Sequence, residues 1–107
     1  MQVKKLTSKE QFNELKNSES AIFMFSAGWC PDCRVIEPIL PQIEADYPAH
    51  EFVEVNRDDF IDICQEYDIY GIPSFLAFSG GQETGRFVSK DRKTDEEIRR
   101  FIDSLSS

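Results

Sequence analysis

Residues 21–27 form an apolar run, Ala-Ile-Phe-Met-Phe-Ser-Ala, that lacks the polar alternation of a half-exposed strand. A strand covered on both faces, as in a parallel sheet, has this pattern because neither face meets water. Residues 51–56 and 74–78 predict two more short strands, and the Gly-Gly pair that follows predicts a hairpin returning along residues 84–89. We therefore expect a small sheet of about four strands, since each run is long enough for one strand.

Between and beyond these strands, apolar residues recur at helical spacing. Ser8 can cap a first helix, with Gln11 as its reciprocal partner. Residues 35–46 predict a second helix, which is kinked because two prolines fall inside it. Residues 94–97 form a capping box before the last helix. A further helix is expected to bury the stripe formed by Phe60, Ile61, Cys64 and Tyr67.

The order of these elements is helix, strand, helix, strand, helix, strand, strand, helix. Parallel connections through helices, followed by a hairpin, predict an α/β fold in which a mixed sheet carries helices on both faces. At 107 residues the chain is long enough for one core, so residues 1–107 are expected to form a single domain.

Composition narrows the class of function. Hydrophobic residues make up 40% and charged residues 30%, which is typical of a soluble globular protein. No apolar segment approaches the roughly 20 residues of a bilayer-crossing helix, and no signal peptide is visible at the start. We therefore expect a cytoplasmic protein without a membrane partner. A net charge of -8 disfavours nucleic acid as a partner, because phosphate binding needs clustered Lys and Arg.

The candidate chemistry lies where the apolar strand meets the kinked helix. Cys30 and Cys33 flank two residues there, which puts Cys30 at or just before the first helical turn. Unpaired backbone N–H groups and the helix dipole stabilise negative charge at that position, so Cys30 is predicted to be the nucleophile. Cys33 lies one turn further inside and is expected to stay protonated and shielded until it attacks a mixed disulfide as the resolving thiol.

Two other interpretations of the cysteine pair stay open. The pair could be half of a zinc site, but only Cys64 and His50 remain as further ligands, without the spacing of a zinc knuckle. No metal is therefore expected. The pair could also belong to a redox-inactive protein that merely keeps the fold. Cys64 itself is expected in the core, because unpaired Cys is among the most buried residue types.

Several motifs resemble the thioredoxin family in order and spacing, over nearly the whole chain. They are Ser26-Ala27-Gly28-Trp29-Cys30-Pro31-Asp32-Cys33, then Pro38, then Tyr70-Gly71-Ile72-Pro73-Ser74, and the Phe-Ser-Gly-Gly turn at residues 78–81. The resemblance implies a thioredoxin-like fold and a protein-disulfide reductase without a cofactor. It also implies oxidised client proteins as substrates and a thioredoxin-reductase-type electron donor. A monomer is expected.

The resemblance also assigns residues around the cysteines. It implies that Pro73 is in the cis form and faces them, and that the backbone at Ile72 pairs with an extended substrate. Trp29 would cover the site beside Cys30, and both Trp29 and Pro31 would contact the substrate. From the residues alone, Pro73 could also end an ordinary trans turn, and Trp29 could simply seal the end of the strand.

Two departures from the family pattern bear on the chemistry. Thioredoxins usually carry Gly-Pro between the cysteines, whereas this chain has Pro31-Asp32, and the Asp32 charge is expected to make the site more reducing by destabilising the thiolate. Behind the cysteines the family has an acid and a lysine on neighbouring strands, where this chain has Met24 and Glu54. Glu54 is therefore a candidate proton acceptor for Cys33, unless it simply reaches solvent.

The leading functional hypothesis is a thiol-disulfide oxidoreductase that reduces protein disulfides through the Cys30/Cys33 dithiol. A reductase of low-molecular-weight-thiol mixed disulfides would use the same Cys30 but would need a site for a peptide carboxylate. A non-catalytic interaction module with a thioredoxin fold would use the substrate groove without turnover. The three hypotheses share the fold. They differ in whether a protein disulfide, a low-molecular-weight-thiol mixed disulfide or no disulfide reacts with Cys30.

Overall fold

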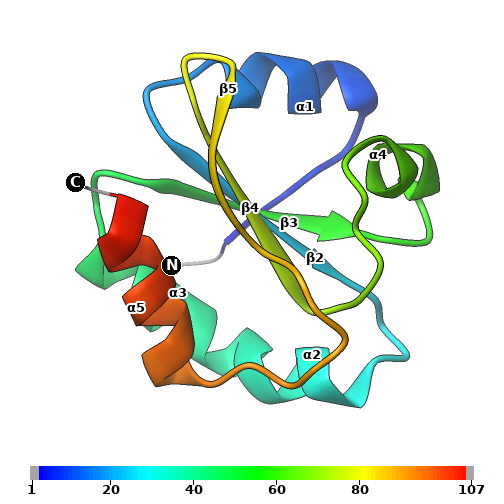
Figure 1. Ribbon diagram of the computed structural model, residues 1–107, viewed down its shortest axis with the longest axis vertical. Coiled ribbons are helices and arrows are strands. Elements are labelled where there is room, and N and C mark those ends of the chain that lie inside the picture. The colour runs from blue at the N-terminus through cyan, green and yellow to red at the C-terminus, as the bar shows by residue number, and fades with distance from the viewer. Residues whose placement is uncertain (1–2, 106–107) are drawn as a thin grey trace.

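The computed structural model describes residues 3–105, which form a five-stranded mixed sheet with helices on both faces (Figure 1). The strands are β1 (Lys4–Lys5), β2 (Ala21–Ser26), β3 (Glu51–Asn56), β4 (Ser74–Ser79) and β5 (Gln82–Phe87). The helices are α1 (Lys9–Lys16), α2 (Pro31–Ile36), the 3₁₀ helix η1 (Glu37–Ile39), α3 (Leu40–Asp46), α4 (Ile61–Glu66) and α5 (Asp95–Leu105). The strand order is β1-β3-β2-β4-β5, with β1 and β2 parallel to β3, and β4 antiparallel to both of its neighbours. The predicted α/β fold is therefore confirmed.

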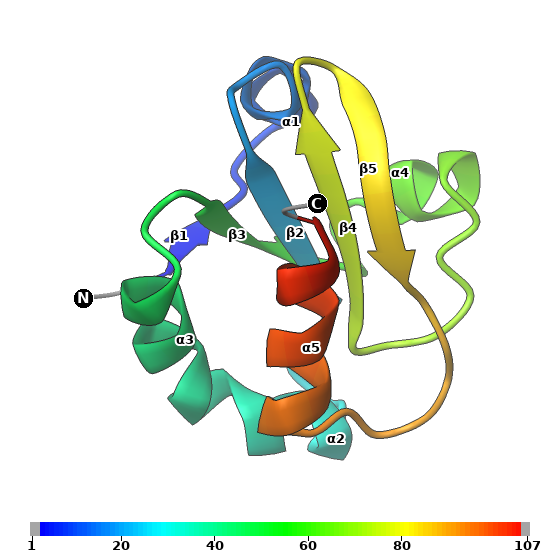
Figure 2. The same ribbon diagram turned by 60° about the vertical axis from the view of Figure 1, so that its left-hand side comes forward.

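The central strand β2 is buried along its whole length because both faces of the sheet carry helices. Phe23 and Phe25 pack in the core with residues of α1 and α4. Ile22 and Met24 pack in the opposite core with residues of α2, α3 and α5. Figures 1 and 2 show these two helical layers on either side of the sheet. The apolar run lacks alternation because successive side chains enter two different cores.

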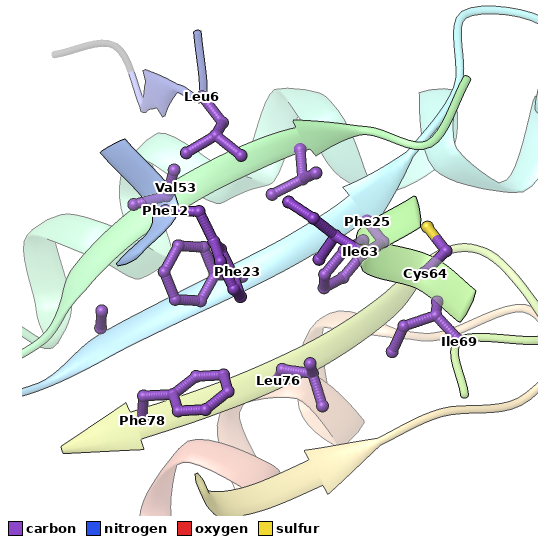
Figure 3. Packing of buried hydrophobic residues seen from close by; sticks show 12 residues of the cluster. Leu6, Phe12, Phe23, Phe25, Val53, Ile63, Cys64, Ile69, Leu76 and Phe78 are labelled. Carbon is purple, nitrogen blue, oxygen red and sulfur yellow. The ribbon is translucent and has the colours of Figure 1, made fainter. Parts of the chain in front are cut away.

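The core beneath α1 and α4 contains a cluster of aromatic side chains among its aliphatic residues (Figure 3). The ring centroid of Phe12, from α1, lies 4.7 Å from that of Phe23 and 6.0 Å from that of Phe78. Tilted and edge-to-face arrangements of this kind place the positive edge of one ring against the negative face of another. Cys64 lies in the same core with Ile69 and is 3% exposed. The expectation that Cys64 is a core residue is confirmed.

Four details of the fold differ from the prediction. β5 spans Gln82–Phe87 rather than residues 84–89, because it begins directly after the Gly80-Gly81 turn. The sheet has one strand more than expected, because the two exposed lysines of β1 pair with β3 and leave no apolar pattern to detect. The single kinked helix is divided into α2, η1 and α3, since the prolines at 38 and 41 lack the N–H groups that a continuous helix needs. On α4 the buried residues are Ile63 and Cys64. Ile61 is 44% exposed, because it is the first residue of this short helix and faces away from the core.

Both predicted helix caps are present. Ser8 Oγ accepts a hydrogen bond from the backbone N–H of Gln11 at 3.1 Å, and Gln11 Oε1 accepts one from the backbone N–H of Thr7 rather than of Ser8. Thr94 Oγ1 accepts from the backbone N–H of Glu97 at 3.1 Å, while Glu97 Oε1 accepts from the backbone N–H of Thr94 at 3.0 Å. The complete capping box fixes the point at which the chain leaves the β5–α5 connection and enters α5.

The β5–α5 connection packs against the segment that precedes β4. A Cβ atom added to Gly71 would lie 2.5 Å from the carbonyl carbon of Ser89 and 2.7 Å from the Cα of Lys90, so glycine is required there. The Ile72–Pro73 peptide bond that follows is cis, as the resemblance implied. Ser74 Oγ donates to the carbonyl of Gly71 at 2.6 Å and lies 3.5 Å from that of Ser89. These contacts hold the connection beside the cis bond.

Gly71→Ala is expected to destabilise the fold by about 1–3 kcal/mol, because the added methyl group meets backbone atoms that cannot turn away. Urea unfolding followed by circular dichroism measures the change in the free energy of unfolding. Gly28→Ala is the matched control, since a Cβ there meets no atom within 4 Å. Equal effects of the two substitutions would contradict the close approach at Gly71.

Candidate active site

Cys30 and Cys33 lie in the first turn of α2, where the chain leaves β2. Cys30 is the N-cap residue, with φ -88° and ψ 111°, and Pro31 takes the first helical position, where its missing N–H costs no hydrogen bond. The backbone N–H of Cys33 donates to Cys30 Sγ at 3.2 Å. A thiolate at Cys30 accepts this hydrogen bond and faces the positive end of the helix, so the local structure stabilises negative charge on its sulfur.

The two sulfurs of the pair are enclosed to different degrees. Cys30 is 5% exposed and Cys33 is 0% exposed. Cys30 is nearly enclosed, because Ile72 packs against the pair. Burial raises the pKa of Cys33 to about 12, and its hydrogen bond with Cys30 is the second cause. Cys33 therefore stays a thiol at neutral pH, and it needs help to ionise when it attacks a disulfide.

Of the predicted substrate-contact residues, Ile72 packs against Cys30, and Trp29 and Pro31 flank it in the chain. Cys30 Sγ lies 4.0 Å from the Ile72 carbonyl oxygen, immediately before the cis bond to Pro73. Trp29 is 61% exposed, and its indole N–H donates to Asp58 Oδ2 at 2.8 Å. Pro31 is exposed on the other side of Cys30 in the chain. The structure therefore places the Ile72 carbonyl at the nucleophile, whereas the indole N–H of Trp29, the residue before it in the chain, contacts Asp58.

The charge of Asp32 is paired rather than free. Arg92 Nε donates to Asp32 Oδ1 at 3.1 Å, and the two side chains are 65% and 32% exposed, respectively. A pair this exposed contributes only about 0.2–1 kcal/mol to stability. It nevertheless brings a positive charge beside the cysteines, so the effect of Asp32 on a thiolate is smaller than that of an isolated carboxylate. Sequence reasoning missed Arg92, which lies 60 positions away along the chain.

Behind the cysteines, the strands align as predicted. Met24 on β2 lies opposite Glu54 on β3, and Met24 is buried in an apolar core. Lys5 on β1 lies opposite Glu54 on its other side. Burial, followed by the neighbouring Glu37, raises the pKa of Glu54, whereas Lys5 lowers it. The acid and the lysine that the family pattern puts on β2 and β3 thus lie one strand further out, on β3 and β1.

Glu37 connects Glu54 electrostatically with the cysteines. Its charge raises the pKa of Cys33 and also that of Glu54. Glu37, Glu54, Lys5 and Ser26 are among the residues that line a cavity of about 270 Å³, which has the size and polarity to hold water. Sequence reasoning missed Glu37 as well. Its spacing of four residues after Cys33 was the available signal, because residues that far apart share a helix face.

The residues weighed as zinc ligands lie in other surroundings. Cys64 belongs to the aromatic core, and His50 Nδ1 contacts Ser20 Oγ. Within residues 3–105, no group of three or more His, Cys, Asp or Glu side chains is placed to hold a metal ion.

Known proteins similar to this chain are thioredoxins. The family model described as Thioredoxin matches residues 2–104. The chain is 38% identical over 80 residues to a thioredoxin H-type of Fagopyrum esculentum, covering 74% of this chain and 69% of the relative. It is 32% identical over 96 residues to thioredoxin-2, mitochondrial, of Schizosaccharomyces pombe, covering 86% and 72%. The crystal structure of thioredoxin from Trypanosoma brucei brucei has the same fold, with a TM-score of 0.86 at 22% identity, covering 97% of this chain and 90% of that one.

Removing the Asp32 charge is expected to raise the reduction potential of the Cys30/Cys33 pair, because the carboxylate disfavours the thiolate in the reduced form. The shift is about 20 mV or less, since about 1 kcal/mol of repulsion corresponds to about 20 mV for two electrons. Asp32→Asn should therefore raise the potential, and Arg92→Gln, which leaves Asp32 unpaired, should lower it. Equilibration with dithiothreitol buffers of known potential measures both. If both substitutions moved the reduction potential in the same direction, the idea that Arg92 offsets the effect of the Asp32 charge on the thiolate would be wrong.

Proposed function

Because the chain belongs to the thioredoxin family and is a thiol-disulfide oxidoreductase, we propose that it reduces disulfides of oxidised client proteins through Cys30 and Cys33. The observation that carries this proposal is the position of Cys30 Sγ. It accepts a helix-start N–H at 3.2 Å and lies 4.0 Å from the Ile72 carbonyl. An extended client segment that pairs with the backbone at Ile72 as an added strand would present its disulfide to Cys30.

Disulfide exchange at this site takes two steps. The Cys30 thiolate attacks one client sulfur, which forms a Cys30–client disulfide and releases the other client sulfur as a thiolate that takes up a proton. Cys33 then loses its proton and attacks the Cys30 sulfur, which forms the Cys30–Cys33 disulfide and releases the second client thiolate. Two electrons thus pass from the dithiol to the client. A dithiol electron donor must return them before the next turnover.

Thioredoxin-family proteins act on disulfide clients and receive electrons from thioredoxin reductase or a similar donor. We propose the same two classes of partner for this chain, acting as a monomer and as one domain over residues 1–107. The family match over residues 2–104 supports one domain. No helix within residues 3–105 is long and apolar enough to cross a membrane. The cytosol stays a prediction, because one relative is a mitochondrial thioredoxin.

The two alternative functions have less support from the site. A reductase of low-molecular-weight-thiol mixed disulfides needs a cation for the peptide carboxylate. Arg92 and Lys93, which lie in the β5–α5 connection, are already engaged with Asp32 and with oxygens of their own loop. A non-catalytic module has no need of a helix-start hydrogen bond to the Cys30 sulfur.

Insulin reduction tests the roles of the two cysteines. Cys30→Ser should abolish activity, whereas Cys33→Ser should still attack and then accumulate a mixed disulfide, visible by mass spectrometry without reductant. In the reduced parent, iodoacetamide should modify Cys30 first, because burial raises the pKa values of Cys33 and Cys64 and keeps them as thiols. Cys64→Ser is the control and should keep full activity. Activity in Cys30→Ser would overturn the proposal.

We further propose that Glu54 accepts the Cys33 proton in the second step. Glu54 is half-buried, and burial first and Glu37 second raise its pKa toward the range in which a general base works best near neutral pH. Glu37 and Glu54 both line the polar cavity next to β2, where a water molecule could pass the proton on. The carboxylate form of Glu54 is the base, so the step should become faster as pH rises through its pKa.

Glu54→Gln should slow the resolution of the mixed disulfide by about 100-fold near neutral pH and leave the alkylation rate of Cys30 unchanged. The defect should shrink at higher pH, because hydroxide replaces the missing base. Single-turnover kinetics between about pH 6 and 9 measure both steps. Glu51→Gln, on the same strand, is the matched control, since Glu51 pairs with Lys4 at the surface. A parental rate throughout would show that Glu54 takes no part in proton transfer.

The stability of the same variant checks the burial of Glu54 independently of catalysis. A carboxyl whose pKa is raised by folding destabilises the folded state above that pKa and has no such effect below the unfolded value. Glu54→Gln should therefore stabilise the fold at neutral pH, and the gain should disappear in acid.

A further inference from the structure

Lys93 is the only charged residue within residues 3–105 whose side chain is buried, with 1% exposure. Its Nζ donates to Ser89 Oγ at 2.8 Å, to the Ser89 carbonyl at 3.2 Å and to the Asp91 carbonyl at 2.8 Å. It also lies 5.2 Å from the centre of the Phe87 ring, which favours a cation. Neither step of disulfide exchange described above accounts for a buried lysine here.

The three oxygen atoms around Nζ suit a charged Lys93. An ammonium has three N–H donors, which match the two carbonyl oxygens and the Ser89 hydroxyl oxygen around Nζ. Burial lowers the pKa of Lys93, and the charges that face it raise the pKa again, in the order Asp91, Glu97, Cys33 and Asp32. Cys33 and Asp32 are contributed by α2, and the other two by the connection and α5. Ionisation of Cys33 and the charge on Lys93 therefore favour each other.

The connection that carries this cation packs against the elements that hold the cysteine pair. Arg92, its neighbour in the chain, contacts Asp32 in α2 at 3.1 Å. The Ser89 carbonyl, which accepts from Lys93, lies 3.5 Å from Ser74 Oγ just after the cis bond. Figures 1 and 2 both show the β5–α5 connection running past the start of α2. The connection that carries Lys93 thus contacts both the cysteine helix, through Arg92, and the cis-bond segment, through Ser89.

We propose that Lys93 is a positioning residue for the resolving step, and that its fixed positive charge stabilises the Cys33 thiolate that attacks the mixed disulfide. The inference rests on the proposed role of Cys33. Burial, the Cys30 sulfur and Glu37 all oppose ionisation of Cys33, whereas the interaction between Lys93 and Cys33 favours the charged form of both groups. Because the effective dielectric constant is lower in a buried site, two charges interact more strongly there than at the surface. Lys93 neither gives nor takes a proton, so the exchange stays balanced as written above.

Release of thionitrobenzoate isolates this step. The Ellman reagent reacts with Cys30 and leaves a mixed disulfide there, and Cys33 then expels a second, coloured thionitrobenzoate that needs no proton to leave. The rate of this second release, followed by stopped flow, reports how readily Cys33 ionises for its attack at each pH. Cys33→Ser should show no second release. The alkylation rate of Cys30 by iodoacetamide serves as the reference for the first thiol.

Lys93→Met should slow the second release roughly three- to tenfold and move the rate–pH curve upward by about 0.5–1 pH unit. Lys93→Arg, which keeps the cation, should stay within about threefold of the parent. Lys90→Met is the matched control, because Lys90 lies in the same connection and is exposed. Lys93→Gln is a second neutral variant that keeps two N–H donors for the loop, in case the methionine does not allow folding.

An unchanged rate–pH curve in the neutral variants would overturn the proposal. So would a higher KM for insulin with an unchanged second release, since Lys93 would then only hold the loop. If both neutral variants failed to fold while Lys93→Arg folded, the charge would serve folding and the proposal would also fail. If the parent itself showed no second release, the role of Cys33 and with it the proposed function would be wrong.

Discussion

The hydrogen bond from the Cys33 backbone N–H to the Cys30 sulfur is the contact on which the site depends. It forms because β2 ends beside the start of α2, where Pro31 begins the helix and Cys30 is left as its cap. The turn that offers an N–H group to one sulfur also carries the other into the interior, where burial raises its pKa to about 12. One helix start therefore makes two chemically different thiols from two identical residues.

The charges around this pair come from segments that are far apart in the sequence. Arg92 approaches from the β5–α5 connection, Glu37 follows the cysteine helix, and Glu54 lies opposite Lys5 on the outer strands. The central strand has Met24 instead, which keeps the core continuous. This arrangement leaves titratable groups close to the resolving thiol without burying an unpaired carboxylate in the middle of the sheet, where desolvation would be most costly.

Local patterns in the sequence predicted the features that local contacts determine. The strand at residues 51–56 has the predicted bounds, and the strand predicted at 21–27 is one residue shorter. The second strand could be predicted because a strand buried on both faces consists almost entirely of apolar residues. β1 escaped prediction because its two exposed lysines become ordered only by pairing with β3. The burial of Lys93 was not predicted because lysine is rarely buried, and its residue type does not show that oxygens of Ser89 and Asp91, a few positions earlier, surround its Nζ.

The closeness of the two sulfurs also affects how the site survives peroxide. A thiolate oxidises first to a sulfenic acid, and further oxidation to the sulfinic acid is irreversible in most proteins. A sulfenic acid on Cys30 would have Cys33 as its neighbour in the same helical turn, so the two would condense with loss of water. The product is the disulfide that client reduction also leaves. Oxidation of Cys30 by peroxide would therefore end in the Cys30–Cys33 disulfide, and the electron donor that completes each turnover would reduce it.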